Sequence, residues 1–224
     1  MREQQTRAAE RVAGGASQEV RLIGGRWKRT PLPVPTSAGL RPTPARVRET
    51  LFNWLGQDLS GWRVLDAFAG SGALGLEAAS RGAERVTLIE RDAVLARSLK
   101  SVVQRLTQGA SAQVGQRIEV LQADALAWMP SGRQAFDLVF LDPPFDEGLF
   151  DAAMDAACEC VPEGGWVYVE APHELSHAVP VASGHVASTW RSRLSRHRHG
   201  QAGAVQFHLF QRVASNGAAP TQGA

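Results

Sequence analysis

The sequence has few cysteines and lacks long apolar runs. Its two cysteines, Cys158 and Cys160, are too few and too close together for a disulfide framework or a four-ligand zinc site. We therefore expect two buried thiols and no metal. The chain also lacks the apolar core of a signal peptide and any run long enough to span a bilayer. These absences argue against secreted and membrane proteins and predict a cytoplasmic protein without a membrane partner.

Acidic residues are missing from two stretches of a chain whose formal net charge is only +2. Residues 20–48 hold six arginines and one lysine but no acid, and five arginines follow Glu174, the last acid of the chain. Such stretches are typical of surfaces that bind a polyanion. A solvated, solubilising surface is the alternative interpretation.

The length and composition predict one main domain. A chain of 224 residues that is 44% hydrophobic can bury one sizeable core. Residues 1–19 and 214–224 are polar and unpatterned, so we expect disordered tails there. Between the tails we expect an amino-terminal extension over 20–60 and the main domain over 61–213.

Strand-like and helical patterns alternate within this domain. Short apolar runs predict strands over 63–68, 85–90, 117–124, 136–142 and 165–170, and helical patterns separate them over 73–81, 92–106, 125–129 and 149–160. This alternation is typical of an α/β fold whose parallel sheet is covered on both faces. Residues 188–212 break the pattern with two strand-like runs around a glycine-containing loop, which predicts an antiparallel hairpin at one edge of the sheet.

Acidic residues lie at or next to the end of each predicted parallel strand. They are Asp66, Glu90, Asp124, Asp142 and Glu170. A single acid in such a place is usually a helix cap or a solvated loop residue. Because ligands bind at the carboxyl ends of parallel strands, five together predict one acidic cleft.

A glycine-rich loop follows the first strand. Gly70, Gly72 and Gly75 form G-x-G-x-x-G, which favours a tight turn, and the following helix offers N–H donors at its start. Glu90 lies where a carboxylate binds the hydroxyls of an adenosine ribose. An NAD enzyme fits these features as well. Asp66 favours S-adenosylmethionine instead, since a carboxylate repels a pyrophosphate and attracts an ammonium group, and Asp124 is then placed to accept from the adenine amino group.

The sequence DPPF, which is Asp142, Pro143, Pro144 and Phe145, ends the fourth predicted strand. The two prolines fix φ and remove two N–H groups, so the loop offers acceptors only. Two rigid acceptors match an exocyclic NH₂ group, and the phenylalanine ring offers a surface on which a base can stack. The motif therefore indicates methyl transfer to an amino group, with these four residues as the catalytic set; a simple turn after a buried strand is the alternative.

Four segments together resemble one known family. RLIGGRWKRTPLPVP, LRPTPARVRETLFNWL, DAFAGSGALGLEAASRGA and DPPF, in this order, resemble the RsmD family of bacterial 16S ribosomal RNA guanine-N2 methyltransferases over about residues 20–213. The resemblance implies a class I, Rossmann-like methyltransferase fold with a seven-stranded sheet, S-adenosylmethionine as cofactor, and a guanine of the 30S particle as acceptor. We expect a monomer whose cofactor contacts are Asp66, Phe68, Gly70, Ser71, Gly72, Glu90, Arg91, Asp124 and Ala125.

The basic extension is expected to bind the RNA. A Gly-Gly turn predicts a hairpin around it, and a helix begins near Pro44 with one apolar face that docks on the domain. Arg46 and Arg48 are expected to point away from that face, free for phosphates. Trp27 and Trp54 are more often packed than base-contacting. The predicted RNA-binding set is Arg26, Lys28, Arg29, Arg41 and Arg46.

Three other functions fit part of the sequence. DNA adenine-N6 methyltransferases share the D-P-P-[YF] motif, but they usually carry a further recognition domain for which this chain has no room. Protein glutamine methyltransferases use N-P-P-Y, whereas an acid replaces the asparagine here. A non-catalytic RNA-binding module has no use for the strand-end acids.

Overall fold

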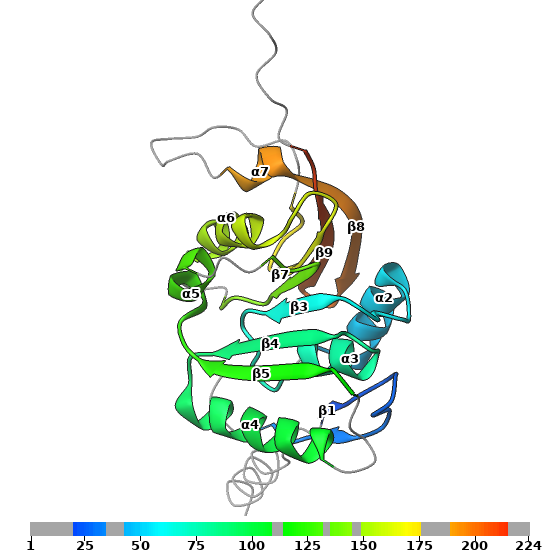
Figure 1. Cartoon of the computed structure of the whole chain (residues 1–224). Helices are drawn as coiled ribbons and strands as arrows, with labels where there is room; N and C mark the ends of the chain where they lie inside the picture. Colours follow the sequence, from blue (N-terminus) through cyan, green and yellow to red (C-terminus); the bar gives the residue numbers. More distant parts are fainter. Residues whose placement is uncertain are drawn as a thin grey trace, which may run out of the picture.

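A twisted seven-stranded sheet forms the centre of the molecule (Figure 1). The computed structural model describes residues 20–34, 43–108, 114–131, 135–144, 149–175 and 189–214. The strands are β3 (Arg63–Asp66), β4 (Arg85–Glu90), β5 (Arg117–Gln122), β6 (Leu138–Leu141), β7 (Trp166–Ala171), β8 (Leu194–Ala202) and β9 (Val205–Arg212). Their order in the sheet is β5-β4-β3-β6-β7-β9-β8, and the strands β3 to β7 are parallel. The predicted α/β class with a mostly parallel sheet is confirmed.

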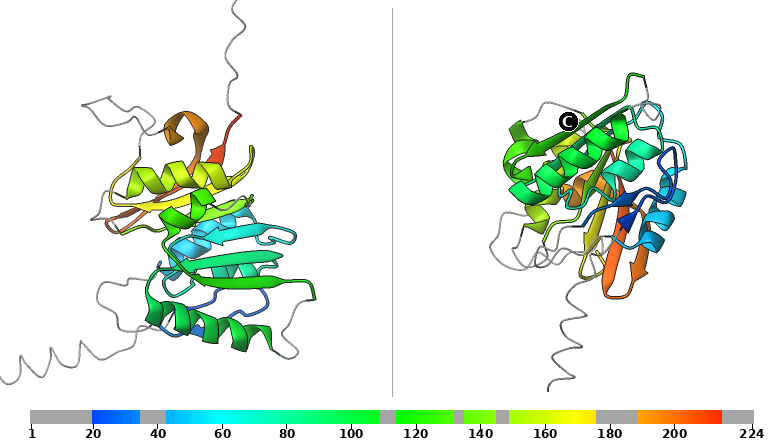
Figure 2. Two further views of the ribbon diagram at one scale, coloured as in Figure 1. Left: turned by 60° about the vertical axis from the view of Figure 1, so that its left-hand side comes forward. Right: turned by 90° about the horizontal axis from the view of Figure 1, so that it is seen from below.

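Helices cover both faces of the sheet. Helices α2 (Ala45–Leu55), α3 (Gly75–Ser80) and α4 (Ala93–Thr107) pack on one face, and α5 (Ala125–Ser131), α6 (Phe150–Cys160) and α7 (Trp190–Arg193) pack on the other. Successive strand residues alternate between the faces, so Phe140 belongs to the first core and Leu141 to the second. Helix α4 and the β8–β9 hairpin lie at opposite ends of the molecule (Figure 2).

The carboxyl-terminal hairpin closes one edge of the sheet as predicted. Strand β9 pairs antiparallel with both β7 and β8, so the edge is antiparallel while the centre is parallel. Three of the arginines around this hairpin form ion pairs with acids from earlier in the chain. The pairs are Arg191 with Asp151, Arg193 with Glu159, and Arg196 with Glu174. The acid-free tail is therefore less available to a polyanion than its composition indicates.

The two cysteines are buried, as the sequence predicts. Cys158 and Cys160 are free and buried on α6, and burial raises the pKa of each thiol to about 11. In the described ranges no cluster of histidine, cysteine or acidic side chains is suited to a metal ion. None of the helices described is both long enough and apolar enough to cross a membrane.

The amino-terminal extension, described over 20–34 and from 43 onward, packs on helix α3. Strands β1 (Val20–Arg21) and β2 (Pro31–Leu32) pair antiparallel, which agrees with the predicted hairpin. The hairpin loop docks on Ser80 at the end of α3, whose backbone oxygen accepts from Arg26 N and whose hydroxyl accepts from Trp27 N. Trp27 is buried and Trp54 stacks on Phe207 at 5.3 Å, so both rings are packed within the protein.

A buried carboxylate on α3 joins the extension to the domain. Glu77 is fully buried, accepts from Ile23 N at 2.8 Å and from Arg81 Nε at 2.8 Å, and lies 3.6 Å from Arg48 Nη1. Arg48 also donates to the backbone oxygens of Thr43 and Arg21. The expectation that Arg48 is free for phosphates is therefore wrong: the side chain lies in the core because Glu77 balances its charge there.

Replacing Glu77 by glutamine should destabilise the protein by about 3–5 kcal/mol, because two buried guanidinium groups then lose the charge that compensates them. Urea unfolding of the wild type and the variant measures this difference. Glu84→Gln, which removes an exposed acid four residues after Ser80, is the control and should change stability by less than about 0.5 kcal/mol. Equal stability of Glu77→Gln and the wild type would contradict the structural role of this carboxylate.

Candidate active site

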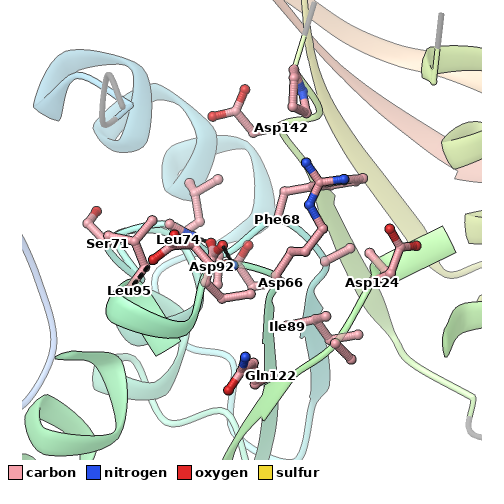
Figure 3. A pocket seen from close by; sticks show the side chains of 18 of the residues that line it. Asp66, Phe68, Ser71, Leu74, Ile89, Asp92, Leu95, Gln122, Asp124 and Asp142 are labelled. Atoms are coloured by element: carbon pink, nitrogen blue, oxygen red, sulfur yellow. Dashed lines mark hydrogen bonds between the residues drawn. The ribbon is translucent and has the colours of Figure 1, made fainter. Parts of the chain in front are cut away.

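A cavity of about 530 Å³ opens at the carboxyl edge of the sheet (Figure 3). Its walls come from the ends of β3, β4, β5 and β6, from the loops that follow them, and from Thr43, which lies just before α2 in the extension. The four parallel strands end at this one edge, which explains why residues far apart in sequence meet there. Side chains of five acids line the cavity: Asp66, Glu90, Asp92, Asp124 and Asp142.

The glycine-rich loop forms one wall. Gly70 and Gly72 have φ angles of 52° and 77°, a region that favours glycine, and Gly72 N donates to the backbone oxygen of Ala69 to close the turn. A Cβ on Gly72 would lie 2.6 Å from Leu99 Cδ2, so the loop packs tightly on α4. Gly72 therefore shapes the loop from behind and is not among the residues that line the cavity.

Asp66 lies beneath this loop and is almost fully buried. Its Oδ2 accepts from Gly75 N at 2.9 Å, so this carboxylate takes the first N–H of α3. That bond occupies the first of the N–H groups that the sequence predicts to be available to a ligand at the start of this helix. Burial raises the pKa of Asp66 to about 7; Gly75 N lowers it, while Glu90 and Glu170 raise it.

Glu90 and Asp124 also accept hydrogen bonds from backbone N–H groups. Glu90 Oε2 accepts from Gly70 N at 2.9 Å and Oε1 accepts from Asp92 N at 2.7 Å. Asp124 Oδ1 accepts from Ala127 N at 3.0 Å. Each carboxylate keeps further lone pairs, so these bonds fix its orientation without using its full capacity as an acceptor.

Asp142 and Pro144 line the cavity, and Pro143 is buried beside them. Figure 3 shows Asp142 above Phe68, and Asp124 on another side of the cavity. Burial raises the pKa of Asp142 well above its usual value, and the nearby Glu170 and Asp66 raise it further. Phe145, the fourth predicted catalytic residue, lies outside the described residues.

The structure brings most of the predicted cofactor set together. Eight of the nine predicted residues line the cavity, namely Asp66, Phe68, Gly70, Ser71, Glu90, Arg91, Asp124 and Ala125. Thr43, Asp92 and Gln122 also line the cavity and were not predicted from the sequence. Asp92 had a recognisable signal, because an aspartate after a strand and before an amphipathic helix is a typical N-cap; it accepts from Val94 N and Leu95 N.

The predicted RNA-binding residues do not all lie near the cavity. Arg46 is exposed in the first turn of α2, three residues after Thr43. Arg26 instead donates to Gln116 Oε1 at 2.7 Å, and Gln116 lies just before β5 begins. The basic hairpin with Lys28 and Arg29 therefore lies near the amino-terminal ends of the parallel strands, whereas the cavity lies at their carboxyl ends. The length of one strand, about 20 Å, separates the two. Arg41 lies outside the described residues.

The charge of the cavity restricts its ligands. Among the described residues that line it, Arg91 is the one lysine or arginine, against five acids. Such a lining attracts a cationic ligand and repels a pyrophosphate. The arrangement thus disfavours a dinucleotide and suits a small ligand that carries positive charge.

Comparisons with known proteins agree with the fold. A family model described as "Conserved hypothetical protein 95" matches residues 20–211. The chain is 39% identical over 204 residues to "Ribosomal RNA small subunit methyltransferase D" of Escherichia coli strain K12, covering 88% of this chain and 92% of that protein.

Two solved structures extend the comparison. One is titled "Putative methyltransferase yhhF from Escherichia coli"; it is 37% identical, with a TM-score of 0.70, and covers 88% of this chain and 99% of its own. The other is a Thermus thermophilus 16S rRNA N2 G1207 methyltransferase in complex with AdoMet and guanosine. It shares the fold at 20% identity and a TM-score of 0.63, covering 89% of this chain and 50% of its own.

The raised pKa of Asp66 predicts a pH-dependent effect on stability. Because the folded protein binds the Asp66 proton more tightly than the unfolded chain, this group lowers stability as the pH rises from about 4 to about 7. Asp66→Asn keeps an acceptor for Gly75 N and should stabilise the protein by about 2–4 kcal/mol at pH 8, with little effect at pH 4.

Chemical unfolding at both pH values measures this difference. Asp58→Asn is the control, because Asp58 is fully exposed and Ser60 lowers its pKa instead of raising it. An Asp66→Asn effect that is the same at pH 4 and pH 8 would show that folding does not raise the pKa of Asp66.

Proposed function

The chain belongs to the RsmD family, and from this premise we propose that it transfers a methyl group from S-adenosylmethionine to the N2 amine of a guanine in small-subunit ribosomal RNA. The observation that carries the proposal is the position of Asp142, Pro143 and Pro144, which follow β6 at the wall of an acidic cavity. The name of the Escherichia coli relative supports a small-subunit ribosomal RNA as the substrate.

The cavity fits S-adenosylmethionine by its charge and size. This cofactor carries an ammonium and a sulfonium group and no phosphate, and it supplies an electrophilic methyl group. Asp66 would hold the ammonium end, Glu90 the ribose hydroxyls and Asp124 the adenine amino group. The raised pKa of Asp66 agrees with this assignment, since a bound cation compensates a carboxylate that is otherwise costly to ionise.

Asp142 and the prolines orient the target amine. The prolines carry no backbone N–H, so the end of β6 presents acceptors only: the Asp142 carboxylate and backbone oxygens. An exocyclic amine donates its two protons to two such acceptors, and its lone pair then points toward the methyl donor. Most of the acceleration comes from this positioning. Phe145 follows the two prolines in the sequence, and we assign its ring the role of stacking on the target base.

The extension over 20–60 is proposed to bind RNA and the domain over 61–213 to carry the chemistry. Thr43 lines the cavity and Arg46 follows it on α2, so a phosphate bound by Arg46 lies close to the target nucleotide. The hairpin with Lys28 and Arg29 would contact RNA about 20 Å away. Two separated contacts fit a folded 30S particle better than a short single strand, and one protein monomer provides both.

Asp142→Ala should lower the methylation rate about 100- to 1000-fold while the cofactor still binds. The lost acceptor acts on the amine in the transition state, which corresponds to about 2–4 kcal/mol. Asp142→Asn should lose less, because an amide oxygen still accepts one bond. Transfer of labelled methyl groups to 30S particles from cells without the gene measures the rate, and calorimetry measures cofactor binding. Equal rates for Asp142→Ala and the wild type would refute the assignment.

The double variant Lys28→Gln, Arg29→Gln should bind 30S particles more weakly, and its affinity should depend less on salt. Each phosphate contact releases counterions, so the slope of log affinity against log salt should fall by roughly 0.7–0.9 units per charge removed. Arg26 is left intact because it also stacks on Trp27 and bonds to Gln116.

The matched control removes two exposed charges from α4, Arg97→Gln and Lys100→Gln. Binding across a salt series compares the two double variants. If both variants show the wild-type slope and affinity, the basic hairpin is a solvated surface and not an RNA contact.

A further inference from the structure

A second carboxyl group lies beside Asp142 at the end of the neighbouring strand. Leu141 on β6 pairs with Val169 on β7, so Asp142 and Glu170 are the next residues on these two strands. Phe140 pairs with Tyr168, and each lies two residues before its acid, so both acidic side chains lie on the same face of the sheet. Glu170 is only 4% exposed and is not among the residues that line the cavity.

Two hydroxyl groups hold Glu170 in this buried place. Its Oε1 accepts from Thr43 Oγ1 at 2.7 Å and from Tyr168 Oη at 3.1 Å. Burying a carboxyl group costs several kcal/mol unless it is well bonded, and an apolar side chain would fill the same space without that cost. Thr43 also lines the cavity, so one of the two donors belongs to the wall beside the candidate substrate.

The charged and titratable groups around this pair lie on β3, β4, β7 and α2. Asp66 approaches from β3 and Tyr168 from β7, and Glu90 acts through Asp66. From α2, Arg48 donates to the backbone oxygen of Thr43, but its charge is balanced by Glu77.

These surroundings act differently on the two acids. Burial raises the pKa of Glu170, while the hydroxyls of Thr43 and Tyr168 lower it. Asp142 has no hydroxyl donor of this kind among the described residues, and Glu170 contributes to raising its pKa. The pKa of Tyr168 is raised well above its usual value, so its hydroxyl stays protonated and can donate.

We propose that Glu170 is a positioning residue for the methyl transfer: Thr43 and Tyr168 stabilise its negative charge, and this charge makes Asp142 the stronger proton acceptor of the two carboxylates. The proposal rests on the function proposed above. Glu170 touches neither the amine nor the cofactor and acts through Asp142.

The proton balance of the reaction explains why such an acceptor is useful. The amine nitrogen forms a bond to the methyl carbon as the carbon–sulfur bond breaks, and the nitrogen then carries a positive charge. One N–H bond must break to restore the neutral amine. The proton passes to the Asp142 carboxylate and reaches solvent when the product leaves. A carboxylate with a raised pKa accepts this proton more readily.

Carbon-13 NMR of labelled carboxyl groups tests the coupling in the free protein, without cofactor or RNA. The Asp142 signal is assigned by its loss in Asp142→Asn. In Glu170→Gln, the pKa of Asp142 should fall by about one unit or more, because a neighbouring negative charge is removed. Glu174→Gln is the matched control, since this exposed acid pairs with Arg196 and should leave the Asp142 titration unchanged.

Kinetics provide the second measurement. In Glu170→Gln the acidic limb of the kcat profile should move to lower pH together with the Asp142 titration, and the plateau rate should fall about tenfold or more. The KM for 30S particles should stay the same. A purely structural role of Glu170 would change stability and leave the acidic limb where it is.

Thr43→Val keeps the shape of the side chain and removes one hydroxyl donor, so it serves if Glu170→Gln does not fold. It should move the Asp142 titration in the same direction, and Thr43→Ser should restore it. If the wild type is active and the pKa of Asp142 is unchanged in both Glu170→Gln and Thr43→Val, the role of Glu170 is refuted while the proposed function stands. A wild type that leaves small-subunit RNA unmethylated refutes the proposed function and this role with it.

Discussion

The buried contact between Glu77 and the arginines Arg48 and Arg81 holds the functional parts of the molecule together. Helix α3 starts at the glycine-rich loop, where Asp66 takes its first N–H, and ends where the hairpin of the extension docks. The Glu77 carboxylate, in the middle of this short helix, binds Ile23 and Arg48 of the extension and Arg81 at the end of the helix. The loop that shapes the cavity and the segment that brings Thr43 to its wall are therefore parts of one unit.

Strand register explains the electrostatics of the cavity. Parallel strands that end at the same level bring Asp66, Asp142 and Glu170 close together in a buried place. Burial raises the pKa of all three, and the charge of Glu170 raises the pKa of Asp66 and Asp142 further. This arrangement costs stability in the absence of a ligand, since like charges are desolvated together. A cationic ligand removes part of that cost, so the same acids that destabilise the free protein favour binding. The structure thus connects the stability of the sheet edge with its preference for positive charge.

The sequence predicts the sheet, the carboxyl-terminal hairpin and most of the cavity because these follow from local periodicity and from strand ends. It does not predict which side chains pair over long distances. Arg48 lies three, four and seven positions before Leu51, Phe52 and Leu55, on the apolar face of α2, but no local pattern shows that Glu77, 29 positions later, balances its charge there. Arg193 follows a stretch without acids and pairs with Glu159 of α6. Likewise, the position of the basic hairpin depends on its docking to Ser80, which no periodic pattern encodes.

The identity of the methylated nucleoside tests the account most directly. Small-subunit ribosomal RNA from cells with and without the gene is digested to nucleosides and quantified by mass spectrometry. The account predicts that N2-methylguanosine falls by one residue per RNA without the gene, and that the wild-type gene restores it while a gene encoding Asp142→Ala does not. An unchanged content of N2-methylguanosine would contradict the assignment of this protein to the methylation of a guanine amine.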